Sequence, residues 1–125
     1  MTKIGLPVTR MDLDAPLAKH FGKAKWLAIL EPPGRCQFVR NPWVDGGTVA
    51  AELASRGCTD VVARRMGCGA YARVAATGMR AWEGDDAVTV RVVADRLASG
   101  SLRPLSLSQD CGERGSHLEE YRNLH

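Results

Sequence analysis

The side chains of this sequence that are best suited to chemistry are a histidine in the stretch KHFGKAKW and a cysteine in the stretch MGCGA. His20 is one of three histidines in the chain, and Lys19 and Lys23 flank it. Cys68 lies between two glycines at the expected start of a helix, where the helix dipole favours an anion and lowers the pKa of a thiol. An imidazole and a thiolate among several cations suit a large anionic ligand that takes nitrogen and sulfur donors, such as an iron–sulfur cluster.

The elements that must position these residues follow from the hydrophobic pattern. Apolar and β-branched runs predict strands at residues 3–8, 25–31, 35–41, 60–64 and 79–83. Helical spacing of apolar residues, ended by Gly57 and Gly78, predicts helices at residues 48–57 and 68–78. Residues 85–100 are rich in valine, which favours a strand. Yet Asp85 or Asp86 can cap a helix and Gly100 can end one, so we expect a helix there.

The order β-β-β-α-β-α-β-α predicts an α/β fold with a five-stranded mixed sheet and helices on its faces. If the fourth and fifth strands run parallel to the first, their exits lie at the same edge as the loop that ends in His20. Ligands of open α/β sheets bind outside the carboxyl ends of the strands. We therefore expect one rim to gather the candidate residues Lys19, His20, Lys23, Arg64, Arg65 and Cys68.

Composition limits the classes of function. The chain has 125 residues, 45% apolar and 25% charged, which is typical of one globular domain. A formal net charge of +3 is too small for a nucleic-acid-binding arm or a polybasic membrane tail. No apolar stretch approaches the roughly 20 residues of a membrane span, and the N-terminal residues do not resemble a signal peptide. We therefore expect a cytoplasmic protein whose four cysteines are thiols or ligands rather than disulfides.

Each candidate also has a plainer structural interpretation. His20 could be a solvated loop histidine, and Cys68 a small residue in a tight turn. Arg64 and Arg65 could be a solvated pair. Two other cysteines, Cys36 and Cys58, are expected to be packing thiols, and Phe21 is expected to be a core residue. In the C-terminal stretch, Cys111 and His117 are a further candidate metal-ligating pair, although their spacing is wider than that of common zinc knuckles.

Together, the stretch KIGLPV, the long loop, HFGKA at the second strand and the glycine-rich turn after the fourth strand resemble a known family. It is the dinitrogenase iron-molybdenum cofactor biosynthesis family, of the NifX, NafY and NifB C-terminal-domain type. The resemblance implies a ribonuclease H-like three-layer fold for residues 1–100. Residues 101–125 are polar with scattered glycines, and we expect them to form a loosely ordered tail. The motif histidine of the family corresponds to His20, and its glycine-rich turn corresponds to Gly67 and Gly69. Cys68 and the C-terminal stretch depart from the family pattern.

The resemblance implies a non-catalytic protein of nitrogen fixation that binds an iron–sulfur or iron–molybdenum cluster transiently and carries it between cofactor-assembly proteins. The expected protein is a monomer or weak homodimer and binds neither nucleic acid nor membrane. The alternative is a regulatory or interaction module of the same fold without a cluster. A metal-dependent nuclease is less favoured because the first strand has no acidic residue, and a thiol redox enzyme because Cys68 has no resolving cysteine close in sequence.

Overall fold

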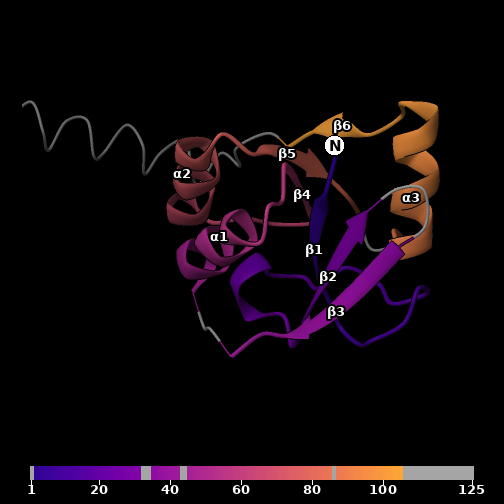
Figure 1. The fold of residues 1–125 in the computed structure, drawn as a ribbon, viewed down its shortest axis with the longest axis horizontal. Coiled ribbons are helices and arrows are strands. Elements are labelled where there is room, and N and C mark those ends of the chain that lie inside the picture. The colour runs from indigo at the N-terminus through magenta and orange to yellow at the C-terminus, as the bar shows by residue number, and fades with distance from the viewer. Residues whose placement is uncertain (1, 32–34, 43–44, 86, 106–125) are drawn as a thin grey trace, which may run out of the picture.

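The computed structural model describes residues 2–31, 35–42, 45–85 and 87–105 of the chain (Figure 1). Its strands are β1 (Ile4–Val8), β2 (Trp26–Glu31), β3 (Arg35–Arg40), β4 (Asp60–Ala63), β5 (Arg80–Glu83) and β6 (Arg103–Pro104). Its helices are the 3-10 turn η1 (Phe21–Lys23) and the α-helices α1 (Gly46–Ser55), α2 (Cys68–Thr77) and α3 (Val90–Ser99). The predicted order of elements is confirmed up to α3.

The strands form one mixed sheet with the order β3-β2-β1-β4-β5-β6. β1 and β2 pair antiparallel, as do β2 and β3, whereas β4 runs parallel to β1 and β5 parallel to β4. The predicted strand directions are therefore correct, but the predicted number of strands is wrong, because β6 adds an antiparallel edge to β5. This strand has only two residues, one of them a proline, so no alternating pattern announces it. It lies in the stretch that the sequence assigned to the tail.

Helices cover both faces of the sheet (Figure 1). On one face α1, α2 and η1 enclose a cluster that includes Phe21, Val49, Leu53 and Val74. On the other face α3 covers a second cluster with Ala15, Leu17, Val88 and Val93. The predicted three layers are thus present, while the likeness to ribonuclease H stays a prediction.

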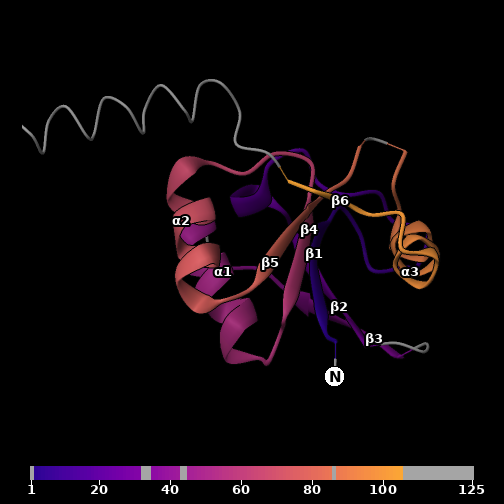
Figure 2. The same cartoon turned by 90° about the horizontal axis from the view of Figure 1, so that it is seen from above.

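The loop between β1 and η1, residues 9–20, crosses the carboxyl end of β1 from one face of the sheet to the other. We call it the strap. Ala15 and Leu17 of the strap pack into the cluster under α3, whereas Phe21, which follows it, packs under α1 and α2. Figure 2 shows β1, β4 and β5 pointing to one edge of the molecule, where η1 and the start of α2 also lie. The strap therefore carries the candidate histidine to the edge at which the parallel strands end.

The third α-helix begins later than its sequence predicts. Its N-cap is Thr89, whose hydroxyl accepts a hydrogen bond from the backbone N–H of Val92 at 3.2 Å. The predicted caps were Asp85 and Asp86. Asp85 instead accepts a hydrogen bond from the backbone N–H of Ala87 in a turn, and Asp86 lies outside the described residues. Gly78 and Gly100 end α2 and α3 in the left-handed conformation, as expected of C-terminal glycines.

Candidate functional site

The loop that carries His20 is tied to the exit of β4 by a backbone hydrogen bond. The N–H of Phe21 donates to the carbonyl of Arg65 at 3.1 Å. The ring of Phe21 is only 2% exposed, so the core residue predicted from the sequence is confirmed. His20 itself is the extended residue before η1, and its side chain is exposed. The structure thus places His20 next in sequence to a residue that is bonded to the Arg64–Arg65 turn.

Three small residues bring η1 and the first turns of α1 and α2 into contact. A Cβ atom at Gly22 would lie 2.4 Å from the backbone nitrogen of Gly46. A Cβ atom at Gly46 would in turn lie 2.6 Å from the Cβ of Ala70. Any side chain at Gly22 would therefore push η1 away from α1. The close packing fixes the position of His20 relative to the start of α2.

The described residues leave the two glycines at the start of α2 exposed. Gly67 is the N-cap and makes no side-chain capping bond, so the first N–H groups of the helix are not satisfied by a cap side chain. A Cβ atom at Gly67 or Gly69 would lie within 4 Å of no described atom outside its own stretch of chain. Both glycines are exposed, and the packing of the described residues does not require them. They leave room for a large group to approach the helix N-terminus.

Four cations of the predicted rim have no carboxylate partner among the described residues. Lys19, Lys23 and Arg65 are exposed and Arg64 is half-buried, and none of them forms an ion pair with a described carboxylate within 4.0 Å. The nearby carboxylate of Asp45 caps α1 by accepting hydrogen bonds from the hydroxyl and the backbone N–H of Thr48. Those bonds, with a smaller contribution from the charge of Arg73, lower the pKa of Asp45. Asp45 is therefore ionised at neutral pH and is occupied by the helix end.

The cysteines divide into two groups. Cys36 and Cys58 are free, and burial raises the pKa of both, to about 11 for Cys58. They are packing thiols with little thiolate at neutral pH, as predicted. Cys68 is half-buried and disulfide-bonded, so the expectation that it is a thiol is wrong for this structure. A thiolate at Cys68 requires prior reduction. Cys111 and His117 lie outside the described residues.

Within the described part of the chain, no three His, Cys, Asp or Glu side chains lie close enough together to hold a metal ion. Asp12 and Asp14, which a nuclease would need, instead form ion pairs with Arg10 and Arg91. The only buried carboxylate among the described residues, Asp60, lies at the start of β4, at the other end of the sheet. The rim therefore offers an imidazole and cations to an incoming anion, but not a cage for a bare cation.

A polar hollow of about 470 Å³ lies farther along the same sheet edge, at the exit of β5. Its lining residues are Glu83, Gly84, Asp85, Arg96, Ser101 and Arg103. The sequence predicted that Glu83 and Gly84 reach this edge. It did not predict the contribution of α3 and β6, because nothing in the pattern brings residues 96–103 back beside β5. Two carboxylates and two guanidinium groups line this hollow. It is therefore less selective for an anion than the cationic rim around His20.

Two further cations at this edge, Lys25 and Arg40, were not among the sequence candidates. Lys25 directly precedes β2, and Arg40 pairs with Trp26 at the end of β3. Because β2 and β3 pair antiparallel, the start of β2 and the end of β3 meet at this edge. Strand direction was therefore the signal that could have found these two cations.

Comparison with known proteins agrees with this architecture. The model of the dinitrogenase iron-molybdenum cofactor family matches residues 2–100. The chain belongs to this family, and the predicted NifX-like resemblance is confirmed. Membership gives the chain a place among the proteins of iron–molybdenum cofactor biosynthesis. No curated protein matches the chain.

Several solved structures share the fold. A candidate NifB protein from Thermotoga superposes with a TM-score of 0.75 at 24% identity, over 86% of this chain and 97% of that one. The apo form of the orange protein from Desulfovibrio gigas gives 0.76 at 19% identity, over 85% and 94% of the two chains. A candidate dinitrogenase from Methanocaldococcus jannaschii gives 0.63 at 12% identity, over 85% and 96%. At these identities the structures support the fold alone.

Proposed function

We propose that the protein is a non-catalytic carrier that binds an iron–sulfur or iron–molybdenum cluster, or its precursor, at the rim around His20 and passes it between cofactor-assembly proteins. The observation that supports this most is the hydrogen bond from the N–H of Phe21 to the carbonyl of Arg65 at 3.1 Å, because it joins the family's motif loop to the turn before α2. Two stretches far apart in sequence thereby contribute to one open, cationic surface.

The residues of the rim have distinct roles in this proposal. His20 supplies an imidazole ligand, since its side chain is exposed and the packing of Phe21 and Gly22 fixes its backbone. Cys68 supplies a thiolate once an external dithiol has reduced its disulfide and has itself been oxidised to a disulfide. Gly67 and Gly69 leave space for a bulky cargo beside the open N-terminus of α2. A cluster with few protein ligands suits a carrier, because the cargo must also leave.

The cations hold the charge of the cargo. Lys19, Lys23, Arg64 and Arg65 have no carboxylate partner among the described residues, so they can neutralise an anionic cluster without first breaking an ion pair. The carrier works in the cytoplasm as a monomer or weak homodimer in this proposal, with assembly proteins as donor and acceptor.

Anaerobic reconstitution tests the cargo. The protein, reduced and freed of excess thiol, is incubated with ferrous iron and sulfide, and the charge-transfer absorption of the reisolated protein is recorded. We expect His20→Ala and Cys68→Ala each to lower the affinity for the cluster by about tenfold or more, as loss of metal-site residues does. Cys58→Ala, which removes a buried thiol at the other end of the sheet, is the matched control and should load as the wild type does. Equal absorption in the wild type and in the His20, Cys68 and Cys58 variants would rule out the proposed ligands.

The second candidate function is an interaction module of the same fold without a cluster. It is favoured by the absence of three clustered metal ligands in the described part of the chain. A wild-type protein that stays colourless after reconstitution but still binds its partner would support it. A nuclease needs carboxylates that converge on metal ions, and no such group is present among the described residues.

A further inference from the structure

The charged residues at the two ends of the sheet are arranged differently. At the end where β4 begins, the cations have carboxylate partners. Nζ of Lys3 lies 3.7 Å from Glu31, Nε of Arg56 lies 2.9 Å from Glu52, and Nε of Arg80 lies 3.2 Å from Asp60. These pairs balance the charge locally.

At the opposite end, Lys25 and Arg40 are exposed, and neither forms an ion pair with a described carboxylate. Their backbones are fixed side by side. Arg40 pairs with Trp26, the residue after Lys25, and the N–H of Asn41 donates to the carbonyl of Lys25 at 3.0 Å. Two cations without a carboxylate partner among the described residues thus lie where β2 begins and β3 ends, outside the residues proposed to hold the cargo.

The strap adds apolar side chains to this edge. Met11 is 53% exposed and Leu13 is 39% exposed, and they are the exposed large hydrophobic residues of the described part of the chain. The strap leaves β1 at Val8, which pairs with Trp26, so Thr9 follows beside Lys25 at the carboxyl end of β1, from which the tip with Met11 and Leu13 extends. Apolar and cationic side chains therefore occupy the same end of the sheet.

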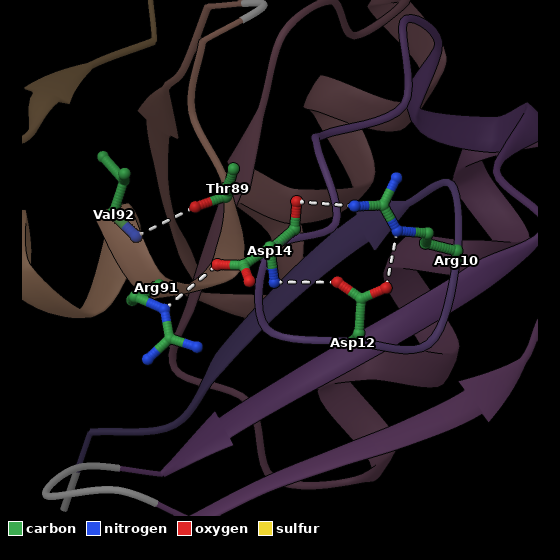
Figure 3. A network of polar contacts seen from close by, with 6 residues as sticks. All are labelled: Arg10, Asp12, Asp14, Thr89, Arg91 and Val92. Carbon is green, nitrogen blue, oxygen red and sulfur yellow. Dashed lines mark hydrogen bonds and ion pairs between the residues drawn. The ribbon is translucent and has the colours of Figure 1, made fainter.

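Polar contacts hold the exposed tip of the strap in place (Figure 3). Arg10 bonds to the side chain of Asp12 at 2.5 Å and to the carbonyl of Asp14 at 3.2 Å. Nε of Arg91 donates to the side chain of Asp14 at 3.0 Å, and its backbone N–H donates to the carbonyl of Leu13 at 2.9 Å. A loop fixed in this way presents Met11 and Leu13 to solvent with little conformational entropy left to lose on binding.

We propose that Met11, Leu13, Lys25 and Arg40, which we call the docking edge, bind an acidic surface of a protein partner that also offers an apolar contact. Methionine and arginine are enriched in protein interfaces. Unpaired cations steer an acidic partner toward the edge and align it. A nucleic acid is disfavoured because the exposed large hydrophobic residues of the described chain include no aromatic ring for base stacking. A membrane is disfavoured because two apolar side chains give little buried area.

A peptide titration tests the docking edge without a known partner. The probe is the peptide EELEEL, with QQLQQL as its uncharged counterpart, titrated at low ionic strength into protein with assigned amide resonances. We expect EELEEL to shift the resonances of Met11, Leu13, Lys25 and Arg40, and QQLQQL to bind at least about threefold more weakly. The double variant Lys25→Gln/Arg40→Gln should bind EELEEL about three- to tenfold more weakly than the wild type.

The matched control is Arg35→Gln/Arg56→Gln, which removes the same charge from cations that have carboxylate partners at the other end of the sheet. It should bind within about twofold of the wild type. Equal weakening by both double variants would overturn the proposal, since net charge alone would then explain binding. So would shifts confined to residues outside the docking edge, or an absence of binding.

Two further measurements separate this edge from its alternatives. The double variant Met11→Ser/Leu13→Ser should lose more affinity for EELEEL than for hexaglutamate, because only EELEEL offers leucine side chains. The binding of hexathymidine or of phosphatidylserine vesicles should not depend on the four residues of the docking edge. If it did, and the binding of EELEEL did not, the assignment of a protein partner would be overturned. The docking edge does not depend on the cargo. Lys25→Gln/Arg40→Gln should keep the cluster absorption of the wild type, and its loss would overturn the separation of the two surfaces.

Discussion

Gly22 lies against the first turn of α1, and the space between them admits no side chain. A Cβ atom added at Gly22 would lie 2.4 Å from the backbone nitrogen of Gly46 and 2.9 Å from the carbonyl carbon of Asp45. Because both contacts are with backbone, no side-chain rotation can relieve them. The glycine of the HFG motif is thus explained by packing within the protein, before any ligand is considered.

Gly22→Ala should destabilise the fold by about 1 to 3 kcal/mol, as overpacking does. The same substitution at Gly69 is the control, because Gly69 lies within α2 and a Cβ there meets no atom of another described segment within 4 Å. Gly69→Ala should instead stabilise the protein by about 0.5 to 1 kcal/mol, since alanine favours a helix. Denaturant unfolding measures both. Similar changes in stability would show that η1 does not pack against α1 as described.

Single residues of the site differed in how well the sequence predicted them. Burial of Phe21 follows from an apolar ring in a polar loop. The resemblance marked Gly67 and Gly69 as a glycine-rich turn, and the structure has them at the N-cap and in the first turn of α2. The contact of Gly22 with Gly46 was not predictable, because it depends on how η1 packs on α1. Nor was the disulfide of Cys68, since composition favoured reduced thiols.

At the scale of elements, the strap and α3 depend on each other. The first N–H groups of a helix have no partner within the helix. In α3, the N–H of Val90 donates to the carbonyl of Ala15 at 3.3 Å, and that of Arg91 to the carbonyl of Leu13 at 2.9 Å. The hydroxyl of Thr89 accepts the next N–H, from Val92. The strap therefore caps the helix, and the helix orders the strap.

Thr89→Ala removes the side-chain acceptor of this cap and should cost about 1 kcal/mol. Because the strap bonds to the same turn, faster amide exchange should extend from Val92 to Arg91. Thr89→Ser, which keeps the hydroxyl, should restore both stability and exchange. Thr77→Ala, at the end of α2, is the control, and it should leave exchange in α3 unchanged. Unaltered exchange at Val92 in Thr89→Ala would contradict the capping role.

This dependence also explains why the predicted start of α3 was wrong. Asp85 and Asp86 are good local caps, and local sequence contains no sign that backbone carbonyls from residues 13 and 15 are available. The predicted helices before it were nearly correct, since Gly57 and Gly78 mark their ends locally. The ends of a helix could be predicted where residues of the helix itself cap it. They could not be predicted where backbone groups from a distant part of the sequence cap it.

At the scale of the whole molecule, the sheet order was predictable because connections between strands constrain their direction. That direction alone brings the exits of β1 and β4 to one edge. The division of charge between the two ends was not predictable, because ion pairs such as Arg80 with Asp60 depend on the register of adjacent strands. In the described part of the chain, the cations at one end of the sheet are paired with carboxylates and several cations at the other end are not, so the two ends affect stability differently.

The cationic end should make stability depend on ionic strength. Charges on Lys19, Lys23, Lys25, Arg40, Arg64 and Arg65 repel one another, and the repulsion is screened as the Debye length falls from about 30 Å at 0.01 M salt to about 10 Å at 0.1 M. The wild type should therefore become more stable over this range. Removing two of the charges, in Lys25→Gln/Arg40→Gln, should stabilise the protein by about 0.5 kcal/mol at low salt and weaken its salt dependence.

Arg35→Gln/Arg56→Gln should change stability in the opposite direction, because it leaves Glu31 and Glu52 with fewer cations nearby. Urea unfolding of the three proteins at both salt concentrations distinguishes the two effects. If both double variants changed stability with the same sign, the repulsion would be a property of net charge and not of one end of the molecule. If the signs are opposite, the unpaired cations lower the stability of the free protein, and an anion bound at that end, whether cargo or partner, would restore it.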